Sequence, residues 1–468
     1  MKYSEHKIFK NKLPVQALFE PFIHDRLPFL LESGQNTRAM GRYSYFGSDP
    51  FLTLSCKGNK CVVGSESGKK EHKEPALIVL RRLLDSYKLE GSIGLKSPFL
   101  CGAVGFFAYD FGFSIENIKR SNKPDSIVPD LMFGFYDVVI RFDHIKKELM
   151  VFSSGFPLKG PARRTRSAQR LKAAIKKLSS ARVMLSKAGN EAGGLKIKSN
   201  FSRQGYIRSV KRAKDYIACG DIYQVNLSQK FSFDAQVDDW RLYRNLAVTF
   251  PVDFAAYFNA GDFVIISASP EKFLCFNGKR VSTRPMKGTR RRTEDPYFNK
   301  LMRNELLDSG KEKAELLMIT DLERNDLGRV CEYGSVRVAS HRQIEAYRNV
   351  FQATAEINGI LRRDKDRIDL INACFPGGSV TGAPKIRAME IIEELEPDSR
   401  SIYTGSLGYL SFHNTLEFNI LIRSFLKTGR RVSFHAGGGI VTDSSPESEY
   451  DETLVKAAAL MEALNYGC

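Results

Sequence analysis

The sequence predicts an α+β fold built from antiparallel sheets. Helix and strand patterns alternate along the chain, but few of them form the strand–helix–strand units of a parallel sheet. Two extended runs, FVIISASPEKFLCF and KRVSTRPMKGT, flank Asn277-Gly278, a dipeptide that favours a tight hairpin turn. The 468 residues are 43% hydrophobic, which suffices for one large integrated core or for two or three ordinary domains.

Strand patterns dominate the first part of the chain. FLTLSCKGNKCVVG and DLMFGFYDVVIRFD have apolar residues at alternate positions, and GAVGFFAYDFG is a glycine-aromatic segment suited to close packing. The basic run KGPARRTRSAQRLKAAIKKL, at 159–178, follows them. Its apolar residues fall at helical spacing, at Ala168, Leu171, Ile175 and Leu178. We therefore expect an amphipathic helix there, with its basic residues in solvent.

A change of composition marks the main boundary of the chain. Residues 186–200, SKAGNEAGGLKIKSN, are rich in Gly, Ser, Lys and Asn, which is typical of a linker. They separate an N-terminal region, 1–185, from a second region, 201–468. In the second region QGYIRSVKRAKDYIACGD has the pattern of a helix, and DIYQVNLSQKFSF has the pattern of a strand.

The composition also bears on location and partners. No stretch approaches the roughly 20 consecutive apolar residues of a membrane span, and the first residues lack a secretory core, so we expect a cytoplasmic protein. Eight cysteines without a CxxC pair and seven histidines without an HExxH motif suggest neither a disulfide framework nor a zinc site, and we expect reduced, mostly buried thiols. The net charge of +18 suits a nucleic acid or an anionic small molecule, and charge alone does not choose between them.

Two pairs of glutamates recur at helical spacing. Glu312 and Glu315 lie in GKEKAELLMITDLERNDLGRV, and Glu449 and Glu452 lie in SSPESEYDETLVKAAALMEALN, where Pro446 marks a helix start. Residues three apart share one face of a helix, so each pair is either a solvated acidic face or a set of ligands. The apolar stripe on the other side of the second helix is expected at Leu454, Ala458 and Met461.

Two glycine-rich segments suit the binding of an anion. In FHAGGGIVTDSS, Gly437, Gly438 and Gly439 follow a strand pattern and leave the backbone open to a ligand. In FPGGSVTGAPKIRAMEII, Pro384 stands at the first turn of a helix whose N-terminal amides favour a carboxylate or phosphate. Together with the four glutamates, they suit a metal ion such as Mg²⁺ that bridges protein carboxylates and an acidic substrate, although these residues alone name neither the metal nor the acid.

Seven segments, taken in order, closely resemble the chorismate-utilising enzymes, a family that includes anthranilate synthase component I, aminodeoxychorismate synthase component I, isochorismate synthase and salicylate synthase. They are GDIYQVNLSQKF, SASPEKFLCF, RPMKGTRRR, AELLMITDLERNDLGRV, FPGGSVTGAPKIRAMEIIEELEP, IYTGSLGYLSF and AGGGIVTDSSPESEYDET. The resemblance covers 200–465, and it extends more weakly through LLES, RYSYFG and PDLMFGFYDVVIRFD into the first half.

The resemblance implies a fold and a catalytic region. The fold is a large layered antiparallel β-sandwich with outer helices, like that of anthranilate synthase component I. Residues 1–185 correspond to the N-terminal region of that fold, 186–200 to a linker, and 201–468 to a chorismate-binding catalytic domain.

The resemblance also implies roles for individual residues. Glu315 and Glu452 correspond to ligands of Mg²⁺, with Glu312 and Glu449 supporting them. Glu271 corresponds to the acid that protonates the departing 4-hydroxyl group. The residues implied in substrate binding are Gln224, Ser379, Tyr403, Arg423, Gly437, Gly438 and Gly439.

Three positions bear on which reaction is catalysed. Isochorismate and salicylate synthases carry a lysine that activates water where this chain has Gln224, and an amide cannot act as that base. Ammonia is therefore the expected nucleophile. Anthranilate synthases have alanine where this chain has Lys287, and a histidine where it has Gln352 in VFQATA. These differences favour the branch of aminodeoxychorismate synthase component I, the para-aminobenzoate synthase large subunit, and leave anthranilate synthase component I as the alternative.

Lys287, taken alone, is one member of the basic turn STRPMKGTRRR. The resemblance implies that its amine attacks C2 of chorismate as the C4 hydroxyl leaves, and that ammonia then attacks C4 and expels the lysine. The product is 4-amino-4-deoxychorismate, a precursor of p-aminobenzoate and folate.

Two further binding partners follow from the resemblance. The chain has no segment resembling a class I glutaminase, so a separate glutamine amidotransferase subunit is expected to supply the ammonia. LLES and RYSYFG resemble the family's tryptophan pocket, and three uses of it stay open: a feedback site, a buried structural ligand, or an empty relic.

Overall fold

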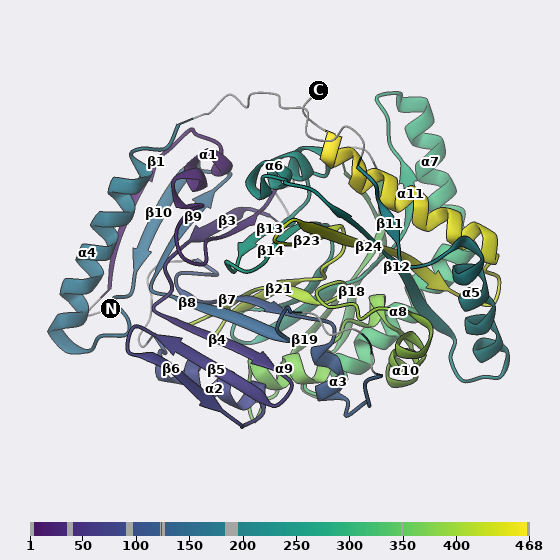
Figure 1. The fold of residues 1–468 in the computed structure, drawn as a ribbon, viewed down its shortest axis with the longest axis horizontal. Helices are drawn as coiled ribbons and strands as arrows, with labels where there is room; N and C mark the ends of the chain where they lie inside the picture. Colours follow the sequence, from purple (N-terminus) through teal and green to yellow (C-terminus); the bar gives the residue numbers. More distant parts are fainter. Residues whose placement is uncertain are drawn as a thin grey trace.

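The computed structural model describes residues 4–34, 41–89, 97–121, 123, 127–182, 195–347 and 350–465. Its strands form two twelve-stranded sheets with antiparallel pairing (Figure 1). The antiparallel α+β fold expected from the sequence is therefore confirmed.

The first sheet runs in the order β1 (Glu5–Lys10), β10 (Glu148–Ser153), β9 (Val138–Asp143), β3 (Tyr43–Gly47), β2 (Phe29–Glu32), β13 (Phe254–Asn259), β14 (Val264–Ser269), β23 (Ser424–Thr428), β24 (Arg431–Ile440), β12 (Gln224–Asp234) and β11 (Lys198–Ser199), with β20 (Gly382–Ala383) beside β12. The second runs in the order β17 (Met286–Arg291), β19 (Val350–Ile360), β16 (Arg280–Arg284), β15 (Lys272–Phe276), β22 (Leu416–Asn419), β21 (Ser406–Ser411), β7 (Gly102–Phe107), β8 (Leu131–Tyr136), β4 (Leu52–Lys57), β5 (Lys60–Ser65) and β6 (Gly68–His72), with β18 (Arg337–Ala346) beside β19.

The helices are α1 (Val15–Phe19), α2 (Ala76–Ser86), α3 (Phe111–Ile115), α4 (Gly160–Leu178), α5 (Arg203–Ala218), α6 (Asp239–Thr249), α7 (Pro296–Asp308), α8 (Gly310–Gly328), α9 (Arg367–Cys374), α10 (Lys385–Leu395) and α11 (Pro446–Asn465), with short 3₁₀ turns η1 (Glu20–Phe22) and η2 (Gly378–Val380). One apolar core joins the two sheets, for example where Phe106 of β7 packs edge-on against Phe258 of β13. A second core lies under α1, α4, α6 and α11 on the first sheet.

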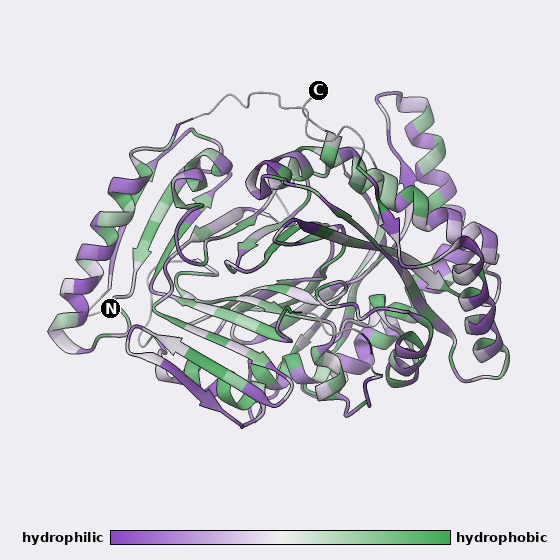
Figure 2. Ribbon diagram, viewed as in Figure 1, coloured by the Kyte–Doolittle hydropathy of each residue, from purple (hydrophilic) through white to green (hydrophobic). Residues whose placement is uncertain are grey.

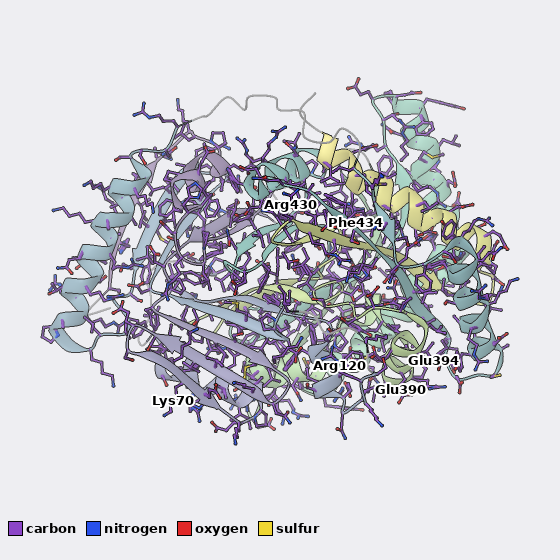
Figure 3. The ribbon with its side chains drawn as sticks, in the orientation of Figure 1. Lys70, Arg120, Glu390, Glu394, Arg430 and Phe434 are labelled. Atoms are coloured by element: carbon purple, nitrogen blue, oxygen red, sulfur yellow. A yellow bond between two sulfur atoms is a disulfide. The ribbon has the colours of Figure 1, made fainter. Side chains whose placement is uncertain are left out.

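The side chains follow this layering. Hydrophobic residues gather along the strands, and hydrophilic residues on the outward surfaces of the helices (Figure 2). Among the labelled side chains, Phe434 of β24 lies inside the molecule, whereas Lys70 and Glu390 lie at its periphery (Figure 3). No helix in the described ranges is long and apolar enough to cross a membrane.

Both sheets combine strands from before and after the expected linker. β2 pairs with β13 in the first sheet, and β7 pairs with β21 in the second. Residues 186–194 of the linker lie outside the described residues, and 198–199 form the short strand β11. The two regions named from the sequence are therefore joined through continuous sheets.

Two runs that look like single strands in the sequence each cross from one sheet to the other. FVIISASPEKFLCF divides into β14 and β15 around Pro270-Glu271, and DLMFGFYDVVIRFD divides into β8 and β9 at Asp137. The hairpin expected at Asn277-Gly278 is confirmed, because β15 and β16 pair with Phe276 opposite Val281. The crossing at Pro270 places Glu271 between the sheets.

The structure corrects the expectation that the cysteines are reduced. Cys56 and Cys61 form a disulfide between β4 and β5. They face each other in the register of this tight hairpin, with their Cα atoms 4.1 Å apart. The sequence offered only a CxxxxC spacing, which by itself does not indicate a disulfide.

The basic helix α4 is held by its arginines as well as by its apolar residues. Ala168 is exposed, and Ser167 takes its place in the interface by donating to the carbonyl of Ser153. Arg170 donates to the fully buried carboxylate of Asp137 at 3.2 Å, and Arg166 lies 3.6 Å from the same group. The basic residues are therefore only partly solvated, contrary to the expectation from the sequence.

We predict that Arg170→Met lowers the free energy of unfolding by about 1–3 kcal/mol, because it leaves the buried carboxylate of Asp137 short of a partner. Arg164→Met on the same helix is the matched control, since Arg164 is largely exposed and its one ion pair among the described residues is with Glu5 at 3.4 Å. Its effect should stay within about 1 kcal/mol. Denaturant unfolding followed by circular dichroism measures both, and equal losses would contradict the prediction.

Candidate functional site

A β-bulge positions Lys287 at the end of the second sheet. The register of β17 against β19 shifts between Lys287 and Thr289, and the intervening Gly288 has a φ of +81°. A side chain at Gly288 would overlap Leu306 and Glu312, so glycine is required on both counts. The Lys287 ammonium nitrogen lies 3.3 Å from the place that a Cβ on Gly439 would occupy. The Lys287 side chain therefore lies directly against the glycine segment of β24.

Gln224 adjoins the same place from β12. Its Nε2 lies 2.8 Å from the position of a Cβ on Gly439, and the residue is fully buried. Neither Nε2 nor Oε1 has a hydrogen-bond partner within the described part of the chain. A buried amide without a partner is costly, so this side chain indicates a place where a polar ligand binds.

The three glycines belong to a strand, whereas the sequence suggested a loop that follows one. Gly437, Gly438 and Gly439 lie inside β24 and pair with Ser228, Leu227 and Asn226 of β12. The glycines are part of the strand because β24 pairs continuously with β12, from Val225 to Asp234, and this pairing extends through all three glycines.

The pairing also shows which glycine amides are open. Asn226 and Ser228 direct their N–H groups away from β24, to Thr381 and to Glu396. In an antiparallel pair the residues opposite them, Gly439 and Gly437, then direct their own groups to the far edge of β24. β23 pairs with β24 as far as Phe434, and in the described residues no strand continues beyond it there.

Glu271 is a buried acid at the sheet crossing. It is 3% exposed, and Ser379 of η2 donates to it at 2.6 Å. Burial raises the pKa of Glu271 from 4.5 to about 7, and Ser379 and the charge of Lys287 oppose this rise. A carboxyl group with this pKa can give up a proton near neutral pH.

The four glutamates come from α8 and α11. A Cβ on Gly438 would lie 3.2 Å from Glu449 and 3.6 Å from Glu452, so these two carboxylates line the glycine strand. Burial raises the pKa of Glu315, and the negative charges of Glu312 and Glu449 add to the rise. Glu315 and the α11 pair therefore face a common space.

Carboxylate oxygens are the donors that Mg²⁺ prefers, so the chemistry of this set suits the ion. No three His, Cys, Asp or Glu side chains of the described ranges are already gathered in a metal-holding geometry. Instead lysines neutralise part of the charge: Lys456 lies 2.7 Å from Glu452, and Lys311 lies 4.0 Å from Glu315. Burial opposes ionisation of Glu452, but Lys456, Lys287 and Lys311 together outweigh it and lower the pKa.

Tyr403 and Arg423 stand on the loops that flank β21 and β23. The ring of Tyr403 stacks on His435 with centroids 4.7 Å apart, and Arg400 lies 5.5 Å over its face. Arg423 lies over the ring of Phe250 and has a φ of +50°. Burial lowers the pKa of Arg423, and the charge of Glu271 is among those that oppose the fall. The charges of Arg423 and Glu271 therefore act on each other.

Several buried groups around the site were missed in the sequence. Arg400 is 2% exposed, pairs with Glu396 at 2.7 Å and donates to the carbonyl of Asn226, which fixes β12. Lys385 pairs with Asp326 at 2.6 Å. This ion pair holds the first residue of α10 against α8. Lys385 and Asp326 stood out as charged residues inside apolar helix patterns, whereas Arg400 lies in the loop after α10 and gave no such signal.

The motifs LLES and RYSYFG line a separate cavity between the two sheets. Its walls include Glu32, Tyr43 and Tyr45 from these motifs, Asp253 just before β13, and Tyr409 and Glu417 from β21 and β22. Burial raises the pKa of Glu32 and of Glu417. The cavity therefore combines tyrosine rings with carboxyl groups.

Comparison with known proteins assigns a family. The profile of the chorismate binding enzyme family matches residues 28–462. The chain is 38% identical to aminodeoxychorismate synthase component 1 of Bacillus subtilis over 439 residues, covering 93% of this chain and 91% of that protein. It is also 38% identical to anthranilate synthase component 1 of Thermus thermophilus over 454 residues, covering 96% and 95%. The crystal structure of anthranilate synthase component I from Streptococcus pneumoniae superposes with a TM-score of 0.78 at 30% identity, covering 91% of this chain and 93% of that one.

We predict a pH-dependent contribution of Glu271 to stability. Because its pKa is higher in the folded protein, about 7, than the usual 4.5, its stabilising effect is full below pH 4.5 and is lost as the pH rises to 7. Glu271→Gln should remove the part of this pH-dependent loss in the free energy of unfolding that Glu271 causes, on the order of 3 kcal/mol. Denaturant unfolding of both proteins from pH 4.5 to 8 measures it, and parallel curves would contradict the assignment.

Proposed function

The chain belongs to the chorismate binding enzyme family, and on this premise we propose that it converts chorismate and ammonia to 4-amino-4-deoxychorismate, the reaction of an aminodeoxychorismate synthase. The observation that carries the proposal is the position of the Lys287 amine, which faces Gly439 and Gln224 in the space between the two sheets. The relatives include anthranilate synthases of equal identity, so the distinction rests on this side chain.

The proposed reaction uses two displacements. The neutral amine of Lys287 forms a bond to C2 of chorismate, the ring double bond shifts, and the C4–oxygen bond breaks. Glu271 gives its proton to the leaving hydroxyl group, which departs as water. Ammonia then forms a bond to C4, the lysine leaves C2, and the proton lost by the ammonia nitrogen returns to Glu271. Chorismate and ammonia thus yield aminodeoxychorismate and water, and Lys287 is regenerated.

The remaining residues hold the substrate. We propose that the backbone N–H groups of Gly437 and Gly439 bind a carboxylate at the open edge of β24, together with Ser379. Arg423 and Tyr403 bind the enolpyruvyl group. Gln224, whose amide is buried and unpartnered among the described side chains, donates to a substrate oxygen. Each of these groups is a donor suited to an anion.

We propose that Glu315 and Glu452 hold Mg²⁺, with Glu312 and Glu449 beside them. When bound, the ion neutralises a substrate carboxylate and withdraws electron density from it. The donor set supports this proposal, because the carboxylates of Glu315, Glu449 and Glu452 face a common space, whereas Glu312 is already paired with Arg290 at 3.1 Å.

We further propose a glutamine amidotransferase partner that supplies ammonia, a cytoplasmic location, and a role in making p-aminobenzoate for folate. The designation "component 1" of the relatives supports the partner. The cavity lined by LLES and RYSYFG, with its tyrosines and carboxyl groups, suits the aromatic ring and ammonium group of tryptophan.

We predict that Lys287→Ala abolishes formation of 4-amino-4-deoxychorismate, because no amine remains to occupy C2. Residual amination should then move to C2 and lead toward anthranilate, which is fluorescent. The assay supplies chorismate, Mg²⁺ and either ammonium salts at high pH or glutamine, and mass spectrometry identifies products and any covalent adduct. Wild type should form the adduct and use ammonium but not glutamine. Anthranilate as the wild-type product would favour anthranilate synthase activity instead.

We predict that Glu315→Gln and Glu452→Gln each weaken Mg²⁺ binding at least about tenfold, because each removes one charged oxygen ligand. Isothermal titration with Mg²⁺ and chorismate measures this, and circular dichroism checks the fold. Glu447→Gln on the first turn of α11 is the matched control, since Glu447 is exposed and bonded only to Ser445 among the described residues. Unchanged Mg²⁺ affinity in both site variants would place the ion elsewhere.

A further inference from the structure

A second buried acid lies directly behind Glu271, and the proposed reaction does not use it. Glu323 of α8 is 3% exposed. Its Oε1 lies 3.4 Å from the place that a Cβ on Gly378 would occupy, so the carboxyl group packs against the first residue of η2. The next residue, Ser379, donates to Glu271 at 2.6 Å. Two consecutive residues of this 3₁₀ turn are therefore each in contact with a buried carboxyl group.

The surroundings of Glu323 hold it in a fixed orientation. Thr283 of β16 donates to its Oε2 at 3.1 Å. A side chain on Gly378 would also overlap Leu322, so α8 and η2 are in close contact at this point. The apolar packing shields the carboxyl group from water, and η2 links it through Gly378 and Ser379 to Glu271.

The charged groups that face the two acids come from different elements. Glu323 faces Asp326 on its own helix, Lys385 at the start of α10, the thiol of Cys374 at the end of α9, and Glu271. Lys385 is already bonded to Asp326, so much of its charge is compensated.

Glu271 faces Lys287 of β17, Arg423 and the Met286 amide. Burial raises the pKa of each acid to about 7, and the charge of Glu271 adds to the rise at Glu323. Because such an interaction is mutual, a charge on Glu323 also opposes ionisation of Glu271.

We infer that Glu323 is a positioning residue for the catalytic proton: its carboxylate, held across η2, keeps the proton on Glu271 until the leaving hydroxyl group takes it. The role as acid catalyst rests on the proposed function. The coupling between the two carboxyl groups does not rest on the proposed function, because it is a property of the protein without substrate. After the proton has left, repulsion between two buried carboxylates favours its return from the incoming ammonia.

Infrared difference spectroscopy of protonated carboxyl groups in the ligand-free protein tests the coupling. Wild type should show two linked titrations near neutral pH. Glu323→Gln keeps an acceptor for Thr283 but removes the charge, so the titration of Glu271 should move to lower pH by on the order of one unit. Asp110→Asn is the matched control. Asp110 is equally buried, its pKa is raised to about 6, and its main charged neighbour is Arg120, so its loss should leave Glu271 unchanged.

Glu271→Gln is the reciprocal variant, and it tests the same coupling if Glu323→Gln does not fold. In Glu271→Gln the titration of Glu323 should fall by the same amount, since the interaction is shared. Where the protein is active, the alkaline limb of kcat should move with the infrared midpoint in Glu323→Gln. An unchanged midpoint of the remaining acid in either variant overturns the inference, whatever product the enzyme makes. A loss of activity with an unshifted midpoint shows a merely structural role and overturns it as well.

Discussion

The candidate site depends on one close approach, that of the Lys287 side chain to the glycine strand β24. Three backbone conditions make it possible: the bulge at Gly288, the absence of a side chain at Gly439, and the pairing of β24 with β12. The bulge lies in the second sheet and the other two conditions lie in the first, so the lysine reaches the glycine strand only when the two sheets pack together. The site residues all come from the second region, whereas both sheets are completed by strands from the first.

Local patterns in the sequence predicted the local structure well. The hairpin at Asn277-Gly278, α4 and the helical pairing of the glutamates follow from rules of a few residues. The apolar stripe predicted for α11 is right only at Met461, which packs against the core; Leu454 is 38% exposed and Ala458 is exposed, while Ala457 and Leu460 are buried. Small alanines allow α11 to lie close to β24, and periodicity alone does not distinguish that face from the neighbouring one.

Contacts between segments that are distant in the chain could not be predicted from local sequence patterns. The crossings at Glu271 and Asp137 are invisible in runs that look like single strands, since nothing local distinguishes one sheet from the other. The family resemblance placed Gln224, Lys287 and Glu271 in one site, and the structure brings them together. Neither resemblance nor pattern indicated Glu323, because an acid within a helical motif ordinarily faces solvent. Its burial comes from the contact of α8 with η2, a packing relation between distant segments.

The distribution of charge connects the fold with the chemistry. Some basic residues serve the fold, because arginines of α4 face the buried carboxylate of Asp137 and Arg400 fixes the backbone of β12. In the site, basic side chains stand beside the carboxyl groups: Arg290 pairs with Glu312, Lys456 with Glu452, and Lys287 lies near Glu271. An acid that keeps its proton in such a region needs a reason not to ionise. Burial supplies that reason at Glu271, and the same burial makes each neighbouring charge decisive for when the proton moves.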